Sequence, residues 1–303
     1  MKILKNKRIL SLLLTLSLVV MMATAVPEMS VVAAGLTKVE LGTTSTFAVL
    51  AGTTITNTGA TTISGKLPEG GGNVGLYPGS DFPGKTSVTM TGWKVYLSDP
   101  AGVARQAKND LTTAYLDAAG RTPTTTFTST DNQLGGQTLK SGVYAFGHAD
   151  TANLTAASPL TLDAEGNPEA VFIFQASSDL VTASGSQIIL KNGARFCRVF
   201  WQVTSSATLG TNSHFVGHIF ALTSIWANTG ATVQGQLLAR NGEVTLNHNT
   251  ITNALCLSNT ATTIDTRVAN SSPQTGTAIP IGIFVLFILS LLTLILCRKR
   301  LNQ

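Results

Sequence analysis

The C-terminal half of this 303-residue chain repeats itself every 18 residues, and few folds accommodate such a period. Similar segments begin at Ser205, Thr223 and Asn241, and Phe215 and Val233 hold matching positions one repeat apart. Short runs of β-branched and aliphatic residues alternate with Gly, Asn and Ser, which is typical of strands and tight turns. A period of this length without a helix inside it predicts a β-helix whose coils contain three short strands and three turns.

The alternation of side chains along each strand divides the repeated positions between the inside and the outside of the coil. On the first face we expect Thr208, Trp226 and Thr245 outside, because aliphatic residues flank each of them. The inward residues of this face are Ala207, Leu209, Ile225, Ala227, Val244 and Leu246.

The second face of the coil carries a more regular set of polar residues. Its inward residues are Ile188, Phe215, Val233 and Ile251. The positions before them are expected outside and hold Gln187, His214, Thr232 and Thr250. The positions after them are also expected outside and hold Ile189, Val216, Gln234 and Thr252.

A related unit occurs near the N-terminus. The sequence Asn-Thr-Gly-Ala-Thr at residues 57–61 recurs unchanged at residues 228–232, and an apolar residue and a glycine follow both copies. The first strand region is therefore expected to be a coil of the same β-helix, with Thr62 and Ser64 extending the second face.

One long helix is predicted between the two halves of the β-helix. Asp99 is a good N-cap and Gly120 follows the last helical residue. The expected apolar stripe is Val103, Ala107, Leu111, Ala114 and Ala118, and the expected solvated face is Arg105, Lys108, Asp110 and Asp117. Because the helix interrupts the coils, we predict one discontinuous domain.

Taken together, these segments resemble the microbial ice-binding (antifreeze) proteins. The resemblance covers about residues 36–257 and rests on motifs at residues 41–43, 47–52, 57–61, 110–115, 170–175 and 238–242. It implies an all-β fold, a discontinuous right-handed β-helix with one long α-helix packed alongside. It also implies a flat face that docks onto ice through ordered hydroxyls, methyl groups and the waters that they hold.

Threonine, of which the chain has 44, suits such a face. Neighbouring strands lie ~4.8 Å apart and same-face residues ~6.7 Å apart along a strand, so the side chains form a regular grid. Threonine is stiff at χ1, so little side-chain entropy is lost on docking. The alternative interpretation is that surface threonine reflects β-propensity alone.

The ice-binding candidates belong to the second face, because a protruding Trp226 interrupts the first. They are Gln187, His214, Thr232, Gln234, Thr250, Thr252, Thr62 and Ser64. The first face supplies a second set of candidates, Thr208, Trp226 and Thr245.

An exposed aromatic residue on a β-helix also marks contacts with sugars or proteins, so Trp226 favours an alternative function. In it the protein is a wall-anchored adhesin that binds a glycan or a protein and lacks ice activity. An enzyme acting on polysaccharide would need clustered carboxylates, which the sequence lacks. The histidines are scattered (His148, His214, His218 and His248), and we expect no catalytic residue, metal or cofactor.

Cys197 and Cys256 are a candidate disulfide, because secreted proteins commonly oxidise such a pair. About three coils separate them, however, and a disulfide needs Cα atoms within ~7 Å. Both the bonded and the free state remain open.

Both ends of the chain carry targeting patterns. Residues 1–34 have the basic start and apolar run of a secretory signal peptide, with cleavage after Ala25 or Ala34. The predicted binding domain, residues 35–257, is followed by a Ser/Thr-rich linker at residues 258–271. Residues 272–303 contain Ser-Pro-Gln-Thr-Gly, an apolar segment and a basic tail, and resemble a Gram-positive Leu-Pro-x-Thr-Gly wall-sorting signal.

This second resemblance implies that a sortase cleaves between Thr275 and Gly276 and joins the protein to peptidoglycan. The alternative is a permanent transmembrane anchor, since ~20 apolar residues span a bilayer. Either way we expect a secreted protein held at the cell surface. Residues 35–275 hold 13 Lys and Arg against 14 Asp and Glu, a net charge of −1, so no basic field indicates nucleic acid as a partner.

Overall fold

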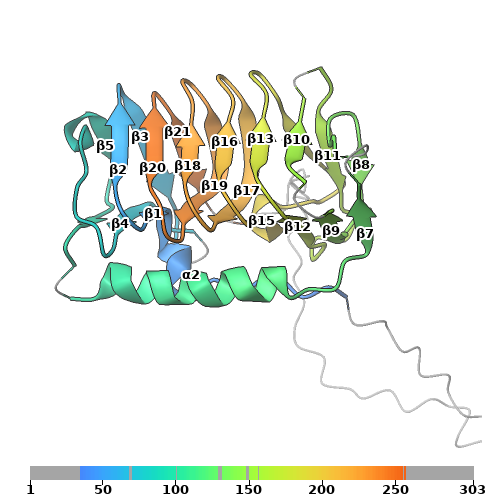
Figure 1. Cartoon of the computed structure of the whole chain (residues 1–303), viewed down its shortest axis with the longest axis horizontal. Helices are drawn as coiled ribbons and strands as arrows, with labels where there is room; N and C mark the ends of the chain where they lie inside the picture. Colours follow the sequence, from blue (N-terminus) through green and yellow to red (C-terminus); the bar gives the residue numbers. More distant parts are fainter. Residues whose placement is uncertain are drawn as a thin grey trace, which may run out of the picture. The chain divides into compact units, whose positions relative to one another are not determined.

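Parallel strands dominate the structure, a computed structural model that describes residues 35–67, 70–99, 101–128, 132–147, 150–155, 157–254 and 256. The described strands form sheets of 12, six and three strands, and paired strands within each sheet run parallel. One α-helix lies beside them (Figure 1). The predicted all-β, β-helix-like fold is confirmed at this level.

The elements have the following bounds. The 12-stranded sheet contains β1 (Phe47–Ala51), β3 (Thr61–Gly65), β4 (Asn73–Leu76), β5 (Val88–Met90), β6 (Val95–Tyr96), β7 (Thr125–Phe127), β9 (Gly142–Phe146), β12 (Phe172–Ala176), β15 (Val199–Val203), β17 (His214–Ala221), β19 (Thr232–Ala239) and β21 (Thr250–Asn253). The six-stranded sheet contains β2 (Ile55–Thr58), β10 (Ala152–Leu154), β13 (Leu180–Thr182), β16 (Ala207–Leu209), β18 (Ile225–Ala227) and β20 (Val244–Asn247). The three-stranded sheet contains β8 (Thr138–Leu139), β11 (Leu160–Asp163) and β14 (Ile188–Lys191), and the helices are α2 (Val103–Ala119), η1 (Gly42–Thr46), η2 (Lys85–Ser87) and η3 (Phe196–Arg198).

Successive strands of the chain visit the three sheets in turn. After β12, the chain forms β13 in the six-stranded sheet and β14 in the three-stranded sheet before it returns to β15. The eight-residue strands β17 and β19 each serve two surfaces. They pair with each other along their whole length, the first half of β19 also pairs with β21, and the second half of β17 also pairs with β15.

The interior of the coil is filled by the inward residues of all three sheets. Aromatic rings follow one another along it. Tyr144 and Phe174 are stacked with centroids 5.4 Å apart, Phe174 and Trp201 are stacked at 3.9 Å, and Trp201 and Phe215 are tilted at 5.3 Å. The Trp201 indole also donates a hydrogen bond to the Val216 carbonyl, at 3.0 Å. Burying one such side chain stabilises the fold by ~1.5–3 kcal/mol, so the stack anchors successive coils to one another.

The N-terminal strands lie next to the last strands of the chain. β1 pairs with β19, β2 with β20, and β3 with β21, as the blue and orange strands of Figure 1 show. The chain then follows α2 across the strands to β7, which lies at the other end of the long strand order of the 12-stranded sheet (Figure 1).

The apolar side of α2 packs on the outside of the 12-stranded sheet and forms a second core. Ala107, Leu111 and Ala114 are buried there against Phe200 and Leu238, among others. This surface of the coil is therefore closed to solvent and to any flat ligand.

The start of α2 differs from the prediction. The helix begins at Val103, after Gly102 in the left-handed region (φ 76°), and not directly after Asp99. Asp99 still caps it, because its carboxylate accepts hydrogen bonds from the backbone N–H groups of Ala104 and Arg105, at 2.5 and 3.2 Å. The shift places Ala104 in the core and leaves Val103 36% exposed, so the prediction for Val103 was wrong.

Lys108 is a second departure, because it was assigned to the solvated side of the helix and is only 8% exposed. Its ammonium group donates hydrogen bonds to the carbonyl oxygens of Ala239, at 2.6 Å, and Arg240. Burial, assisted by the positive charge of Arg240, lowers the pKa of Lys108 to about 7. The long side chain thus fastens α2 to the end of β19.

Cys197 and Cys256 form a disulfide, with Cα atoms 5.7 Å apart. The sequence separation of three coils overstates their distance, because η3, which contains Cys197, lies against β17 and β19. Cys256 follows β21, the strand next to β19.

Across the described ranges, no helix combines the length and the apolar character that a membrane span requires. The predicted signal peptide, the linker, the sorting signal with Thr275 and Gly276, and His148 lie outside the described residues.

Candidate functional site

Four threonines occupy one outward position in four neighbouring strands. Thr89 of β5 pairs with Thr62 of β3, Thr62 with Thr250 of β21, and Thr250 with Thr232 of β19. His214 of β17 continues the row. We call these five residues the threonine ladder, and strand pairing sets its steps at ~4.8 Å.

A second outward row runs beside the ladder, two residues further along each strand. It contains Ser64, Thr252 and Gln234, which are in register with one another. The Ser64 hydroxyl donates a hydrogen bond to Thr252 Oγ1, at 3.3 Å. Val216 comes next and is only 7% exposed, contrary to its predicted outward exposure, so the row ends at Gln234.

The surface changes character beyond β17. His214 Nδ1 lies 2.8 Å from Thr232 Oγ1, which ties the histidine to the ladder. Gln187 pairs with His214 through an isolated parallel bridge. The strand that follows Gln187, β14, belongs to the three-stranded sheet, and its residue Ile189 is 42% exposed. The predicted residues Thr62, Ser64, Thr232, Gln234, Thr250 and Thr252 are thus brought together, and Gln187 lies at the margin.

Buried side chains hold the turns that precede these strands. The Asn249 amide donates hydrogen bonds to the carbonyl oxygens of Asn228 and Ala231, at 3.0 and 3.1 Å, and is 1% exposed. The Asn249 backbone N–H donates to Thr61 Oγ1, at 3.1 Å. These bonds fix the register of β19, β21 and β3 relative to one another. The ladder residues are therefore held in line by the strands that carry them.

Thr89 is a member of the ladder that the sequence interpretation missed. β5 is a three-residue strand outside the 18-residue repeat, and it follows η2 rather than a recognisable coil motif. The alternation around Thr89, with half-buried Val88 and Met90 on either side, is the only local signal.

The six-stranded sheet presents the other open surface. Its central outward row contains Thr56, Thr245, Trp226, Thr208 and Val181. Trp226 and Val181 are 37% and 38% exposed, and the Trp226 indole donates a hydrogen bond to Glu243 Oε1, at 3.1 Å. A bulky indole at its centre makes this row less regular than the ladder.

The ladder and the row beside it carry no carboxylate, ammonium or guanidinium group. In addition, no three His, Cys, Asp or Glu side chains of the described residues lie close enough together to hold a metal ion. His214 and His218, four residues apart on β17, differ in environment, because His214 is exposed and His218 is 2% exposed. The surface is suited to hydrogen bonding and apolar contact with a flat, uncharged partner.

These features define a class, a parallel β-helix with one covered surface and one threonine-lined surface. A family model for ice-binding-like proteins matches residues 49–252. The ice-binding protein of Nostoc sp. (strain HG1) is 44% identical over 215 residues, which cover 71% of this chain and 74% of that protein. The ice-binding protein of Colwellia sp is 33% identical over 232 residues, 73% of this chain and 86% of that protein.

Solved structures give the same result. An ice-binding protein from an Antarctic biological consortium matches with a TM-score of 0.65 and 39% identity, over 72% of this chain and 92% of that chain. One from the Antarctic ascomycete Antarctomyces psychrotrophicus matches with a TM-score of 0.64 and 38% identity, over 71% and 98%. The chain belongs to the ice-binding-like family.

Proposed function

We propose that this protein adsorbs to ice through the surface made by the threonine ladder and its neighbouring row. The observation that carries the proposal is the run of Thr89, Thr62, Thr250 and Thr232 in one outward register. The ice-binding proteins among its relatives support ice, rather than a glycan or a protein, as the partner. Adsorption of this kind needs no catalytic group or cofactor.

The geometry of the ladder explains how docking would work. Hydroxyl and methyl groups repeat at ~4.8 Å from strand to strand and ~6.7 Å along a strand, distances comparable to repeats in the ice lattice. Stiff side chains on a hydrogen-bonded sheet lose little entropy when an ordered surface forms against them. The surface is therefore prepared for ice before contact.

The six-stranded surface is the weaker candidate. A flat crystal plane that rests on Trp226 stands away from Thr208 and Thr245, because these side chains are half-buried beside an exposed indole. α2 covers the third surface of the coil. The threonine ladder is the remaining open surface with a regular row.

We further infer that the fold is a discontinuous right-handed β-helix, with the binding domain at residues 35–257. The pairing of β1, β2 and β3 with β19, β20 and β21 supports the discontinuity. We also propose that the protein is secreted and held at the cell surface by the pattern at residues 272–303. Sortase cleavage at Thr275–Gly276 would join it to peptidoglycan, and a permanent membrane anchor is the alternative.

The test of ice binding is the thermal hysteresis of the purified protein, measured together with the shape of a growing ice crystal. Faceted growth and a gap between melting and freezing temperatures support adsorption. Round crystals without a gap, from a sample with a folded β-rich circular dichroism spectrum, would refute it. Cell fractionation of wild type and Thr275→Ala tests the anchor, because only sortase attachment requires Thr275.

A further inference from the structure

A cavity of about 330 Å³, lined by none of the threonine ladder residues, lies between the N-terminal segment and the coil. Lys38 and Glu40 line it from the N-terminal segment, Arg195 and Arg198 from the region of η3, and His218 from β17. The Cys197–Cys256 disulfide forms part of its wall, so a covalent bond fixes that side. The volume is at the lower end of that of small-ligand sites.

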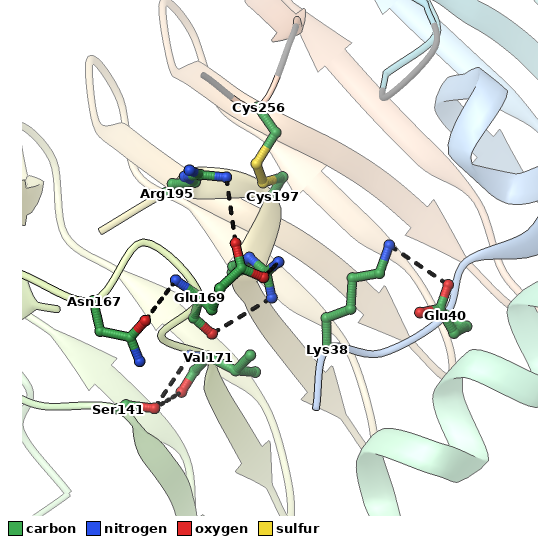
Figure 2. A network of polar contacts seen from close by, with 10 residues as sticks. Lys38, Glu40, Ser141, Asn167, Glu169, Val171, Arg195, Cys197 and Cys256 are labelled. Carbon is green, nitrogen blue, oxygen red and sulfur yellow. Dashed lines mark hydrogen bonds and ion pairs between the residues drawn. A yellow bond between two sulfur atoms is a disulfide. The ribbon is translucent and has the colours of Figure 1, made fainter. Parts of the chain in front are cut away.

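The charges around the cavity are unequal. Glu169 forms ion pairs with two guanidinium groups. Its Oε1 lies 3.8 Å from Arg195 Nη1, and its Oε2 contacts Arg198 Nη2. Figure 2 shows Arg195 joined to Glu169 beside the disulfide, with the Lys38–Glu40 pair on a neighbouring segment. Two guanidinium groups thus share one carboxylate, and this leaves an excess positive charge.

The guanidinium groups are also largely removed from water. The Arg195 and Arg198 side chains are 19% and 14% exposed, whereas those of Lys38 and Glu40 are 51% and 77% exposed. The cavity therefore has a solvated rim and a largely buried cationic wall. Excess charge in such a place favours a counter-ion more strongly than the same charge at the surface.

One donor of the wall residues is buried behind the cavity surface. Within the described part of the chain, the Arg195 Nε–H has no partner at hydrogen-bonding geometry. The His218 ring lies near the Cys197 backbone and the Gln236 amide, but its burial dominates and lowers its pKa to about 4. Neutral imidazole can still donate one hydrogen bond, and an unpaired buried guanidinium N–H is costly.

We propose that this cavity binds a small oxyanion, a phosphate or a carboxylate, held by Arg195 and Arg198 with Lys38 at the rim. Guanidinium groups match the planar or tetrahedral oxygen arrangement of such ions and bind them by paired, charge-assisted hydrogen bonds. The anion balances the excess charge of the two guanidinium groups. The binding joins η3 to the N-terminal segment, so it stabilises the packing of residues 38–45 on the coil.

The experiment is a titration of the purified full-length protein with inorganic phosphate, and separately with acetate, at an ionic strength held constant with NaCl. Isothermal titration calorimetry gives the dissociation constant, and the thermal unfolding midpoint gives an independent measure of binding. We expect saturable binding of at least one anion. The anion that binds more tightly shows whether the site prefers phosphate or a carboxylate.

Three variants locate the site. Arg195→Gln should weaken binding at least about tenfold, the effect of one charge-assisted hydrogen bond. Lys38→Gln should cause a smaller loss, and because Lys38 is exposed this variant decides the question if Arg195→Gln does not fold. Lys140→Gln is the matched control, since Lys140 is an exposed lysine paired with Glu165 and does not line the cavity.

The proposal is wrong if neither anion shows saturable binding to the wild type. It is also wrong if Lys38→Gln and a folded Arg195→Gln bind as tightly as Lys140→Gln. The outcome is independent of ice binding, because Lys38 is not on the threonine ladder and Lys38→Gln should retain thermal hysteresis.

Discussion

Replacing Thr250 by tyrosine should disable ice binding without unfolding the protein. Thr250 is the third of the five ladder positions, between Thr62 and Thr232. The ladder spans four strand steps, ~19 Å, so a protruding ring at its centre leaves two flat segments of ~10 Å each. A single ice plane cannot rest on both segments once the ring stands between them.

The expected loss of adsorption free energy follows from the number of methyl groups that lose contact with the ice. If the plane tilts onto the Thr232 side, the methyl groups of Thr89, Thr62 and Thr250 lose contact. At ~0.8 kcal/mol for each buried methyl group, the loss is ~2.4 kcal/mol. This corresponds to a decrease of roughly 50-fold in the adsorption constant. Thr250 is exposed and tyrosine is favoured in strands, so stability should change by no more than ~0.5 kcal/mol.

Thr245→Tyr is the matched control. It makes the same change in β20, the strand before β21 along the chain, which belongs to the six-stranded sheet. Thermal hysteresis is measured at equal concentrations for the two variants and the wild type, with circular dichroism and thermal unfolding as checks of folding. We expect Thr250→Tyr to lose activity and Thr245→Tyr to keep it. Retained activity in Thr250→Tyr, or the reverse order of the two variants, would refute the assignment of the surface.

Three further predictions concern what holds the β-helix and α2 together. Leu111→Ala removes a fully buried side chain between α2 and the sheet, and chemical denaturation should report a loss of ~2–5 kcal/mol. Because the pKa of Lys108 is lowered to about 7 by folding, the unfolded chain binds more protons between that pH and ~10.5. The free energy of unfolding should therefore rise with pH across this window, by at most ~1.4 kcal/mol per pH unit. The denaturation midpoints of Lys108→Met should lack that rise. An equal rise in both proteins would contradict the assignment of the effect to Lys108. Cys197→Ser opens a 59-residue loop, so thermal unfolding should show a loss of ~4 kcal/mol in the chain-entropy account, whereas an unchanged midpoint would mean that the bond constrains little.

The regular part of the fold could be predicted from the sequence because it repeats. The 18-residue step placed Phe215, Val233 and Ile251 inside and Thr232 and Thr250 outside, and the structure has the same alternation. Inward and outward positions follow from the period of two along a strand, which the local sequence already contains. The shared motif at residues 57–61 and 228–232 pointed to a related N-terminal coil in the same way.

The departures occur where one element meets another. Lys108 has the polarity of a solvated helix position, and only the end of β19, 131 residues away, supplies the carbonyl that accepts its hydrogen bond. Val216 has an outward register, but it is only 7% exposed and belongs to the main apolar core. Helix α2 begins later than predicted because Gly102 adopts a left-handed conformation. The presence of Asp99 as a capping residue does not indicate that conformation.

The candidate site was predicted in part for the same reason. Thr62, Thr232 and Thr250 could be aligned from repeats, whereas Thr89 belongs to a strand with no repeat to align. The disulfide depended on where η3 lies, and the order of residues along the chain could not supply that position.

The most direct measurement of the central claim is adsorption of fluorescently labelled protein to a single-crystal ice hemisphere grown slowly in dilute solution. We predict that wild type and Thr245→Tyr become concentrated on defined planes of the ice and that Thr250→Tyr remains in the liquid. Uniform exclusion of the folded wild type from the ice, or equal adsorption of Thr250→Tyr, would contradict ice binding through the threonine ladder.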